Sequence, residues 1–152
     1  MTDTVAIDQR LDTRRAATDA HRAMAALETS IDFDPPLREL VRVRASIVNG
    51  CAYCLQLHTT DALAAGEEEH RLFALAAWEE SPFFTARERA ALRLTDAVTL
   101  VTDGHVPDEV WEEASEQFDE PELAQLLFAI VAINAWNRLA IASRKTPSAA
   151  HR

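Results

Sequence analysis

The sequence contains little cysteine and little glycine, and these two shortages narrow the class of fold. Among 152 residues there are two cysteines and three glycines. Small secreted proteins that depend on disulfides carry more cysteines, spread along the chain so that they close long loops. Alanine, leucine, glutamate and arginine are abundant instead, and these residue types favour helices over sheets.

Long hydrophobic runs are also missing. The longest nearly apolar run, from Leu126 to Ile133, is far shorter than the roughly 20 residues that a transmembrane helix needs. Residues 2–15 are polar and mixed in charge, without the apolar stretch of a secretory signal. We therefore expect a cytoplasmic protein.

Positive charge is in short supply. Fifteen lysines and arginines stand against 25 aspartates and glutamates, which gives a formal net charge of −10 at pH 7. An acidic surface repels nucleic-acid phosphates and anionic bilayers, so neither nucleic acid nor a membrane is expected as a partner. The hydrophobic fraction of 48% is that of a folded domain.

Residues that begin and end helices divide the chain into short helical segments. The expected boundaries are an N-cap at Asp34, a stop at Asn49-Gly50, a capping box from Thr85 to Glu88 and a start at Asp119. Between these boundaries apolar residues recur with helical spacing, and no run alternates with a period of two. The fold class is therefore predicted to be all-α.

We expect one multi-helical bundle with a short extension at each end. The domain is predicted over residues 16–143, between a flexible N-terminal arm, residues 1–15, and a flexible C-terminal tail, residues 144–152. The nearly all-apolar segment from Leu123 to Ile141 indicates either the central helix of the bundle or part of a subunit interface.

Several large or polar side chains have expected places in this bundle. Trp78, Trp111 and Trp136 are expected to anchor the core or an interface. Phe73 is expected on the inner face of its helix, together with Ala76 and Ala77. Asn134 and Asn137 lie in the apolar last helix and need partners if they are buried: either a neighbouring backbone or a contact between subunits.

The two cysteines lie three positions apart, in Cys51-Ala52-Tyr53-Cys54, and His58 follows. A disulfide between them closes almost no loop, so the pair indicates chemistry more than stability. Both lie in the first turn of a predicted helix, where free N–H groups and the helix dipole stabilise a thiolate. His58 shares their helix face, and imidazole is a suitable base for a thiol near neutral pH.

This arrangement predicts a dithiol redox cycle. One thiolate is oxidised to a sulfenic acid, and the second sulfur condenses with it before further oxidation. A partner dithiol, either a protein or a small molecule, then reduces the disulfide by exchange. The cycle requires no metal, haem or flavin cofactor.

Glu39 is the remaining candidate for the site. A carboxylate beside His58 would hold the imidazole in one tautomer and raise its basicity. The alternative is an ordinary ion pair with Arg42, three residues further along the same helix. The spacing of these residues in the sequence permits both the contact with His58 and the ion pair with Arg42.

Two other interpretations of the cysteine motif stay open. Cys51, Cys54 and His58 could bind zinc if His70 or His105 supplied a fourth ligand. The cysteines could also be inert small hydrophobic residues in a helical core.

A family resemblance joins these residues. Glu39 stands twelve positions before C-x-x-C-x-x-x-H, and the segment from Leu37 to His58 resembles the core of the AhpD-like alkylhydroperoxidases, in the carboxymuconolactone decarboxylase family. Residues 134–138, Asn-Ala-Trp-Asn-Arg, resemble the family's final helix, so that the resemblance covers roughly residues 35–141.

The resemblance implies a role for each site residue. Cys54 meets the peroxide and Cys51 resolves it, while His58 deprotonates Cys54 directly or through water and Glu39 orients His58. The best-known branch has a histidine between the cysteines, where this chain has Tyr53. With a pKa near 10, tyrosine cannot act as that base near neutral pH, so the proton relay is shorter here.

The leading hypothesis is a thiol-dependent peroxidase or disulfide oxidoreductase, an AhpD-like alkylhydroperoxidase acting on hydrogen peroxide or organic hydroperoxides. Resemblance and the apolar last helix also predict a homo-oligomer. One alternative is a small-molecule lyase or isomerase that uses Glu39 and His58 for proton transfer, although the decarboxylase branch lacks the paired cysteines. The other is a non-enzymatic redox sensor whose disulfide changes its association.

Overall fold

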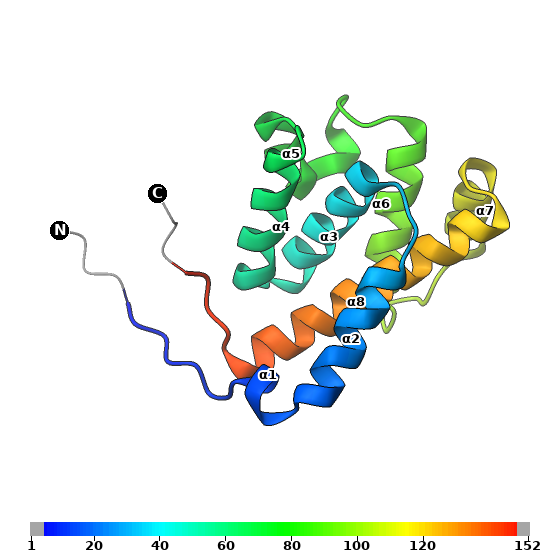
Figure 1. Ribbon diagram of the computed structural model, residues 1–152. Coiled ribbons are helices and arrows are strands. Elements are labelled where there is room, and N and C mark those ends of the chain that lie inside the picture. The colour runs from blue at the N-terminus through cyan, green and yellow to red at the C-terminus, as the bar shows by residue number, and fades with distance from the viewer. Residues whose placement is uncertain (1–4, 149–152) are drawn as a thin grey trace.

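The computed structural model describes residues 5–148 as a bundle of helices, and within that range it contains no strand (Figure 1). The elements in chain order are α1 (Thr13–Ala16), α2 (Thr18–Ser30), α3 (Pro35–Asn49), α4 (Ala52–Ala64), α5 (Glu69–Ala74), the 3₁₀ helix η1 (Leu75–Glu80), α6 (Ala86–Thr99), α7 (Asp108–Gln117) and α8 (Glu120–Ser143). The predicted all-α class is confirmed.

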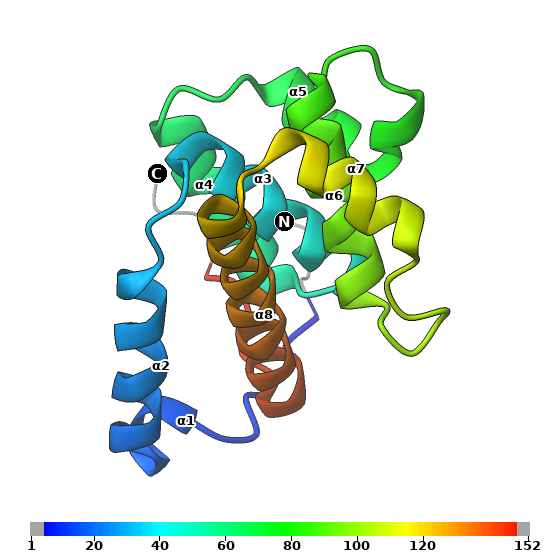
Figure 2. The same cartoon turned by 90° about the vertical axis from the view of Figure 1, so that its right-hand side faces the viewer.

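Helix α3 is the centre of the bundle. It packs against α4, α6 and α8, and its side chains Leu40, Val41, Val43 and Ala45 are almost completely buried. Helix α2 is different, because it has no buried residue and its main helical neighbour outside the N-terminal region is α8. Figure 2 shows α2 beside α8 and below the layer formed by α3 to α6.

The turn between α3 and α4 depends on Gly50. Its backbone is left-handed, with φ of 68° and ψ of 35°, and its N–H donates to the carbonyl of Ile47 (3.1 Å). The N–H of Cys51 donates to the carbonyl of Ser46 (2.9 Å), so the chain leaves α3 and enters α4 within two residues. The predicted stop at Asn49-Gly50 therefore places the cysteine motif at the start of α4.

Replacing Gly50 with alanine is expected to lower the free energy of unfolding by about 1 kcal/mol, because a Cβ disfavours the left-handed conformation. An added Cβ would meet no atom within 4 Å, so backbone strain is the whole cost. Urea denaturation measures the loss. Gly50→Asn should lose less, since asparagine tolerates this conformation, and an alanine variant as stable as the wild type would contradict the account.

Both predicted caps further along the chain are confirmed. Thr85 and Glu88 form a reciprocal capping box at the start of α6. Asp119 forms another with Glu122 at the start of α8. Each box satisfies backbone N–H groups that would otherwise lack partners. Asp34 stands at the N-cap of α3 as predicted, but its side chain makes no capping hydrogen bond.

The predicted inner face at Phe73, Ala76 and Ala77 is wrong. All three are exposed, and the buried side chains are Leu72, Leu75 and Trp78. The chain tightens from α5 into the 3₁₀ helix η1, where side chains repeat every three residues instead of every 3.6. The change of period brings a different set of side chains to the core.

The three tryptophans have different environments. Trp78 is a core anchor, 1% exposed, and its indole N–H donates to Asp96 (3.0 Å). Trp111 is 42% exposed, so it does not anchor the core of this chain. Trp136 is half-buried on α8, close to α2.

Helix α8 is long and apolar enough to cross a membrane by length and composition alone. Half of that apolar window is buried inside the protein, where α8 packs against α3, α6, α4, α7 and α2. Packing therefore accounts for its composition, as expected of a central helix. A role in a subunit interface stays a prediction.

The two extensions partly pack onto the bundle. The N–H of Arg10 donates to the carbonyl of Ser143 (2.8 Å), and the Gln56 amide donates to the carbonyl of Ser148 (2.8 Å). The predicted arm also contains the start of α1, which Asp12 caps. Residues 1–4 and 149–152 lie outside the described range, and the flexibility of arm and tail stays a prediction.

Candidate functional site

Both cysteines lie at the start of α4, as predicted. Cys51 is the N-cap residue and Cys54 lies in the first turn. Both thiols are free, and the two residues are only 2% and 3% exposed. A buried reduced pair at a helix N-terminus can form a disulfide while the helix dipole stabilises the thiolate that begins the exchange.

The two thiols interact, and each shifts the pKa of the other in the opposite direction. The Cys54 thiol donates toward the Cys51 sulfur and, with the backbone N–H groups of Cys54 and Tyr53, lowers the pKa of Cys51 to about 6 against the opposing effect of burial. The same contact with Cys51, together with burial, raises the pKa of Cys54 far above its usual range. The contact between the two sulfurs therefore favours a thiolate on Cys51 over a thiolate on Cys54.

The reduced protein is expected to carry one thiolate at neutral pH. Since the pKa of Cys51 is lowered, the anion is present above about pH 6 and is lost as the pH falls through that value. The ultraviolet absorbance of the thiolate, titrated with pH, measures this midpoint. The double variant Cys51→Ser/Cys54→Ser supplies the baseline, and a midpoint at pH 8 or above, about the value of a free thiol, would contradict the lowered pKa of Cys51.

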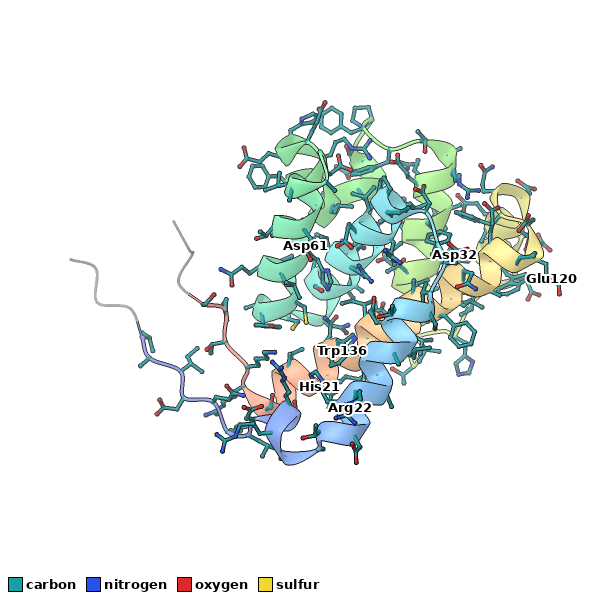
Figure 3. The ribbon with its side chains drawn as sticks, in the orientation of Figure 1. His21, Arg22, Asp32, Asp61, Glu120 and Trp136 are labelled. Carbon is teal, nitrogen blue, oxygen red and sulfur yellow. The ribbon has the colours of Figure 1, made fainter. Side chains whose placement is uncertain are left out.

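Cys54 also faces a large cleft. The cleft has a volume of about 760 Å³ and lies between α1, α2, the start of α4 and the end of α8. Cys54 and His58 are among the residues that line it, and Cys51 is not. The edge-to-face contact of His21 with Trp136, whose ring centroids are 5.1 Å apart, joins α2 to α8 across it (Figure 3).

Glu39 contacts both of its predicted partners. Its Oε2 is 3.0 Å from Nδ1 of His58, and its Oε1 accepts from the guanidinium of Arg42. The carboxylate is nearly buried, so the orienting contact and the ion pair exist together and the pair is not on a solvated face. Because a carboxylate accepts hydrogen bonds, this contact favours a proton on Nδ1 and leaves Nε2 of His58 free as a base.

The link between His58 and the sulfurs is indirect. Within residues 5–148 no hydrogen bond joins His58 to either cysteine, although His58 and Cys54 line the same cleft. A proton can pass between them through a water molecule or a bound substrate, in keeping with the expected water-mediated path.

Asn137 is a site residue that sequence analysis did not identify. It is completely buried on α8, and its side-chain amide lowers the pKa of both cysteine thiols. Its orientation is fixed by Asn49, which donates to its Oδ1 (2.9 Å), and by Ser46, which accepts from its Nδ2 (3.1 Å). A buried amide in an apolar helix was the only sign of this role in the sequence.

Asn134 has a structural place in the same network. Its amide nitrogen donates to Thr99 (3.0 Å) and to the carbonyl of Ile130 (2.9 Å), and its oxygen accepts from Asn49 and Arg138. It therefore finds its partners within one chain and joins α8 to α3 and α6.

Lys145 was assigned to a flexible tail, yet it reaches the site. Its ammonium nitrogen lies 4.0 Å from the centre of the Tyr53 ring, and its charge lowers the pKa of Cys54 against the larger opposing effects. Tyr53 therefore holds a cation beside the thiols. The C-cap of α8 positions this residue: Arg144 is left-handed, and the Lys145 N–H donates back to the carbonyl of Ala140 (2.9 Å).

Within residues 5–148, the ligands considered for a zinc site do not come together. Glu39, His58 and Asp61 place potential ligand atoms within 4.8 Å of one another, and this cluster includes neither cysteine. His70 lies near Glu68 instead, with 3.2 Å between Nδ1 and the carboxylate, and His105 is exposed. Within the cluster, Glu39 is already held by Arg42 and His58.

Comparison with known proteins finds a family model and a relative that each match more than half of the chain. The model of the carboxymuconolactone decarboxylase family matches residues 12–97. The uncharacterised protein YdfG of Bacillus subtilis is 44% identical over 105 residues, which are 69% of this chain and 71% of YdfG.

Solved structures share the fold over most of the length of this chain. A protein of unknown function from Agrobacterium tumefaciens, described as a candidate antioxidant defence protein AhpD, superposes with a TM-score of 0.92 and 33% identity, over 94% of this chain and 100% of that one. The debrominase Bmp8 superposes with a TM-score of 0.79 and 21% identity, over 90% and 75% of the two chains. The likeness to Bmp8 concerns the fold alone.

Proposed function

The chain belongs to the carboxymuconolactone decarboxylase family, and on that premise we propose that it is a thiol-dependent peroxidase of the AhpD-like type. The observation that supports this most is the reduced, buried pair Cys51 and Cys54, of which Cys54 lines a cleft of about 760 Å³ together with His58. A cleft of this size suits small organic molecules, so organic hydroperoxides fit it better than hydrogen peroxide alone.

The reaction has an oxidative and a reductive half. The Cys54 thiolate attacks the terminal peroxide oxygen, the O–O bond breaks, and Cys54 becomes a sulfenic acid while the alkoxide takes a proton to leave as an alcohol. The Cys51 sulfur then attacks Cys54, which forms the disulfide and releases water. A dithiol reductant restores both thiols by exchange and leaves as its own disulfide. One hydroperoxide and one dithiol are consumed in each turn.

A thiolate on Cys51 is compatible with this cycle when the proton on Cys54 leaves that sulfur before the attack. When a hydroperoxide enters the cleft, transfer of the Cys54 proton to Cys51, or to Nε2 of His58 through water, produces the attacking thiolate. Asn137 and Lys145 both favour the anion on Cys54. Glu39 holds the His58 imidazole in place while it accepts or returns the proton.

Turnover with a defined pair of substrates tests this proposal. Wild-type protein is mixed with cumene hydroperoxide and dithiothreitol, and consumption of peroxide and thiol is followed together. The proposal predicts equal consumption of peroxide and dithiol, with loss of catalysis in each single cysteine variant. No turnover by the wild type, or turnover that does not depend on the cysteines, would overturn it.

The cysteine variants also distinguish the peroxidase from the two alternatives, a lyase or isomerase and a non-enzymatic redox sensor. A lyase or isomerase that uses Glu39 and His58 would keep its activity in the double cysteine variant. A redox sensor would form the disulfide with one equivalent of peroxide and change its association, without sustained turnover.

A further inference from the structure

The cleft beside Cys54 is basic, although the protein is acidic. The whole chain has a formal net charge of −10. The cleft is lined by four lysine or arginine residues and by one acidic residue: Arg14, Arg22, Arg42, Lys145 and Glu28. Positive charge is therefore concentrated at the cleft that Cys54 lines.

Two of the four cations are neutralised by the protein itself. Arg42 lies between two carboxylates, Glu28 and Glu39. Arg22 pairs with Asp19 on the surface of α2, with 2.9 Å between nitrogen and oxygen. Because of these ion pairs, Arg42 and Arg22 offer little unbalanced positive charge to a ligand in the cleft.

The other two cations have no such partner. Within residues 5–148 no carboxylate oxygen lies within 4.0 Å of the Arg14 guanidinium or the Lys145 ammonium. Lys145 rests on the Tyr53 ring, which holds the cation but does not cancel its charge. Arg14 comes from α1 and Lys145 from the segment after α8, so the two reach the cleft from different parts of the chain.

Much of the remaining lining is apolar. The apolar and aromatic side chains that line the cleft are Ala25, Tyr53, Leu57, Trp136, Leu139 and Ala140. Apolar walls with a few charged groups are the usual composition of a site for a small organic molecule, and the charged groups fix its orientation. Glu28 does not oppose an anion here, because Arg42 and the Trp136 indole N–H both donate to its carboxylate.

We propose that the cleft binds small organic molecules that join an apolar body to a carboxylate, with the carboxylate at Arg14 and Lys145 and the apolar body against Trp136 and Leu139. This inference rests on the proposed function, and it makes the ligand that reacts at Cys54 a compound with a carboxylate. It is either the organic hydroperoxide or the thiol reductant, and both present the same chemistry to the cleft. The guanidinium and ammonium groups supply charge-assisted hydrogen bonds that a neutral analogue cannot make.

Binding of an unreactive probe tests the recognition without any redox step. The probe is 12-hydroxydodecanoic acid, compared with its primary amide, and binding is followed by calorimetry and by tryptophan fluorescence. The acid is expected to bind at least about tenfold more tightly than the amide, and the preference should fall in high salt. In Arg14→Gln/Lys145→Gln the acid should bind only as well as the amide, while amide binding stays the same.

The neighbouring cations provide a matched control. Arg15 and Arg144 are exposed, adjacent in sequence to the two proposed residues, and do not line the cleft. Arg15→Gln/Arg144→Gln removes the same formal charge and should keep the preference for the acid. Equal binding of acid and amide by the wild type, or an equal loss in this control, would overturn the proposal.

Two kinetic arms identify which ligand carries the carboxylate. In the first, kcat/KM is compared for a hydroperoxide with a terminal carboxylate and for its methyl ester. In the second, an anionic dithiol is compared with a neutral one in reduction of the Cys51–Cys54 disulfide. A charge preference that disappears in Arg14→Gln/Lys145→Gln supports the proposal in whichever arm shows it. If the protein binds the acid preferentially but does not turn over peroxide, the peroxidase function is wrong, and the inference about the carboxylate site is still supported.

Discussion

Replacing Cys54 with serine is expected to lower hydroperoxide turnover by at least about 10³-fold, because a serine hydroxyl does not ionise near neutral pH and does not attack peroxide. The change is nearly isosteric at a residue that is 3% exposed, so the fold should tolerate it. Steady-state consumption of cumene hydroperoxide measures the loss. Circular dichroism and thermal unfolding confirm that the variant is folded.

The companion variant Cys51→Ser separates the roles of the two sulfurs. Without a resolving thiol, Cys54 should still consume one equivalent of hydroperoxide and stay a sulfenic acid, which dimedone traps. Sustained turnover should be lost. The opposite pattern would make Cys51 the attacking thiol: one equivalent consumed by Cys54→Ser and none by Cys51→Ser. The lowered pKa of Cys51 would agree with that role, whereas Cys51 does not line the cleft.

Replacing His58 with alanine is expected to lower kcat/KM for the hydroperoxide by about 10²-fold or more, the usual contribution of a general base. Added imidazole should restore part of the activity, because removal of the side chain leaves space beside the cleft. His70→Ala is the matched control, since His70 is exposed and does not line the cleft.

Glu39→Gln extends this test to the orienting contact. Glutamine keeps the size of the side chain but can present an N–H toward Nδ1 of His58, so it no longer favours one tautomer. We expect a smaller loss than in His58→Ala and a changed pH profile. An unchanged pH profile in both variants would remove the Glu39–His58 pair from the proposed mechanism.

The parts of the site that lie on one continuous segment could be predicted from the sequence of that segment. Cys51, Cys54 and His58 follow a helix stop at Gly50, so their place in α4 depends only on neighbouring residues. The contact of Glu39 with His58 needs α3 to pack beside α4, which spacing permits but does not require; the family resemblance supplied the expectation.

Contacts that depend on the packing of distant segments could not be predicted in the same way. Asn137 reaches the thiols because α8 crosses α3 next to Ser46. Lys145 reaches Tyr53 because the chain turns back after α8, where the sequence suggested only a polar tail. The inner face of the segment that runs from α5 into η1 was predicted wrongly for a local reason, since a 3₁₀ turn replaced the α-helical period.

The central claim is that a hydroperoxide oxidises Cys51 and Cys54 to a disulfide. The direct measurement is a mass spectrum of the reduced protein after one equivalent of cumene hydroperoxide, with free thiols alkylated before digestion. The account predicts a peptide from Ala45 to Arg71 that has lost two hydrogen atoms and carries no alkyl group, together with one equivalent of cumyl alcohol. A doubly alkylated peptide beside unconsumed peroxide would contradict it.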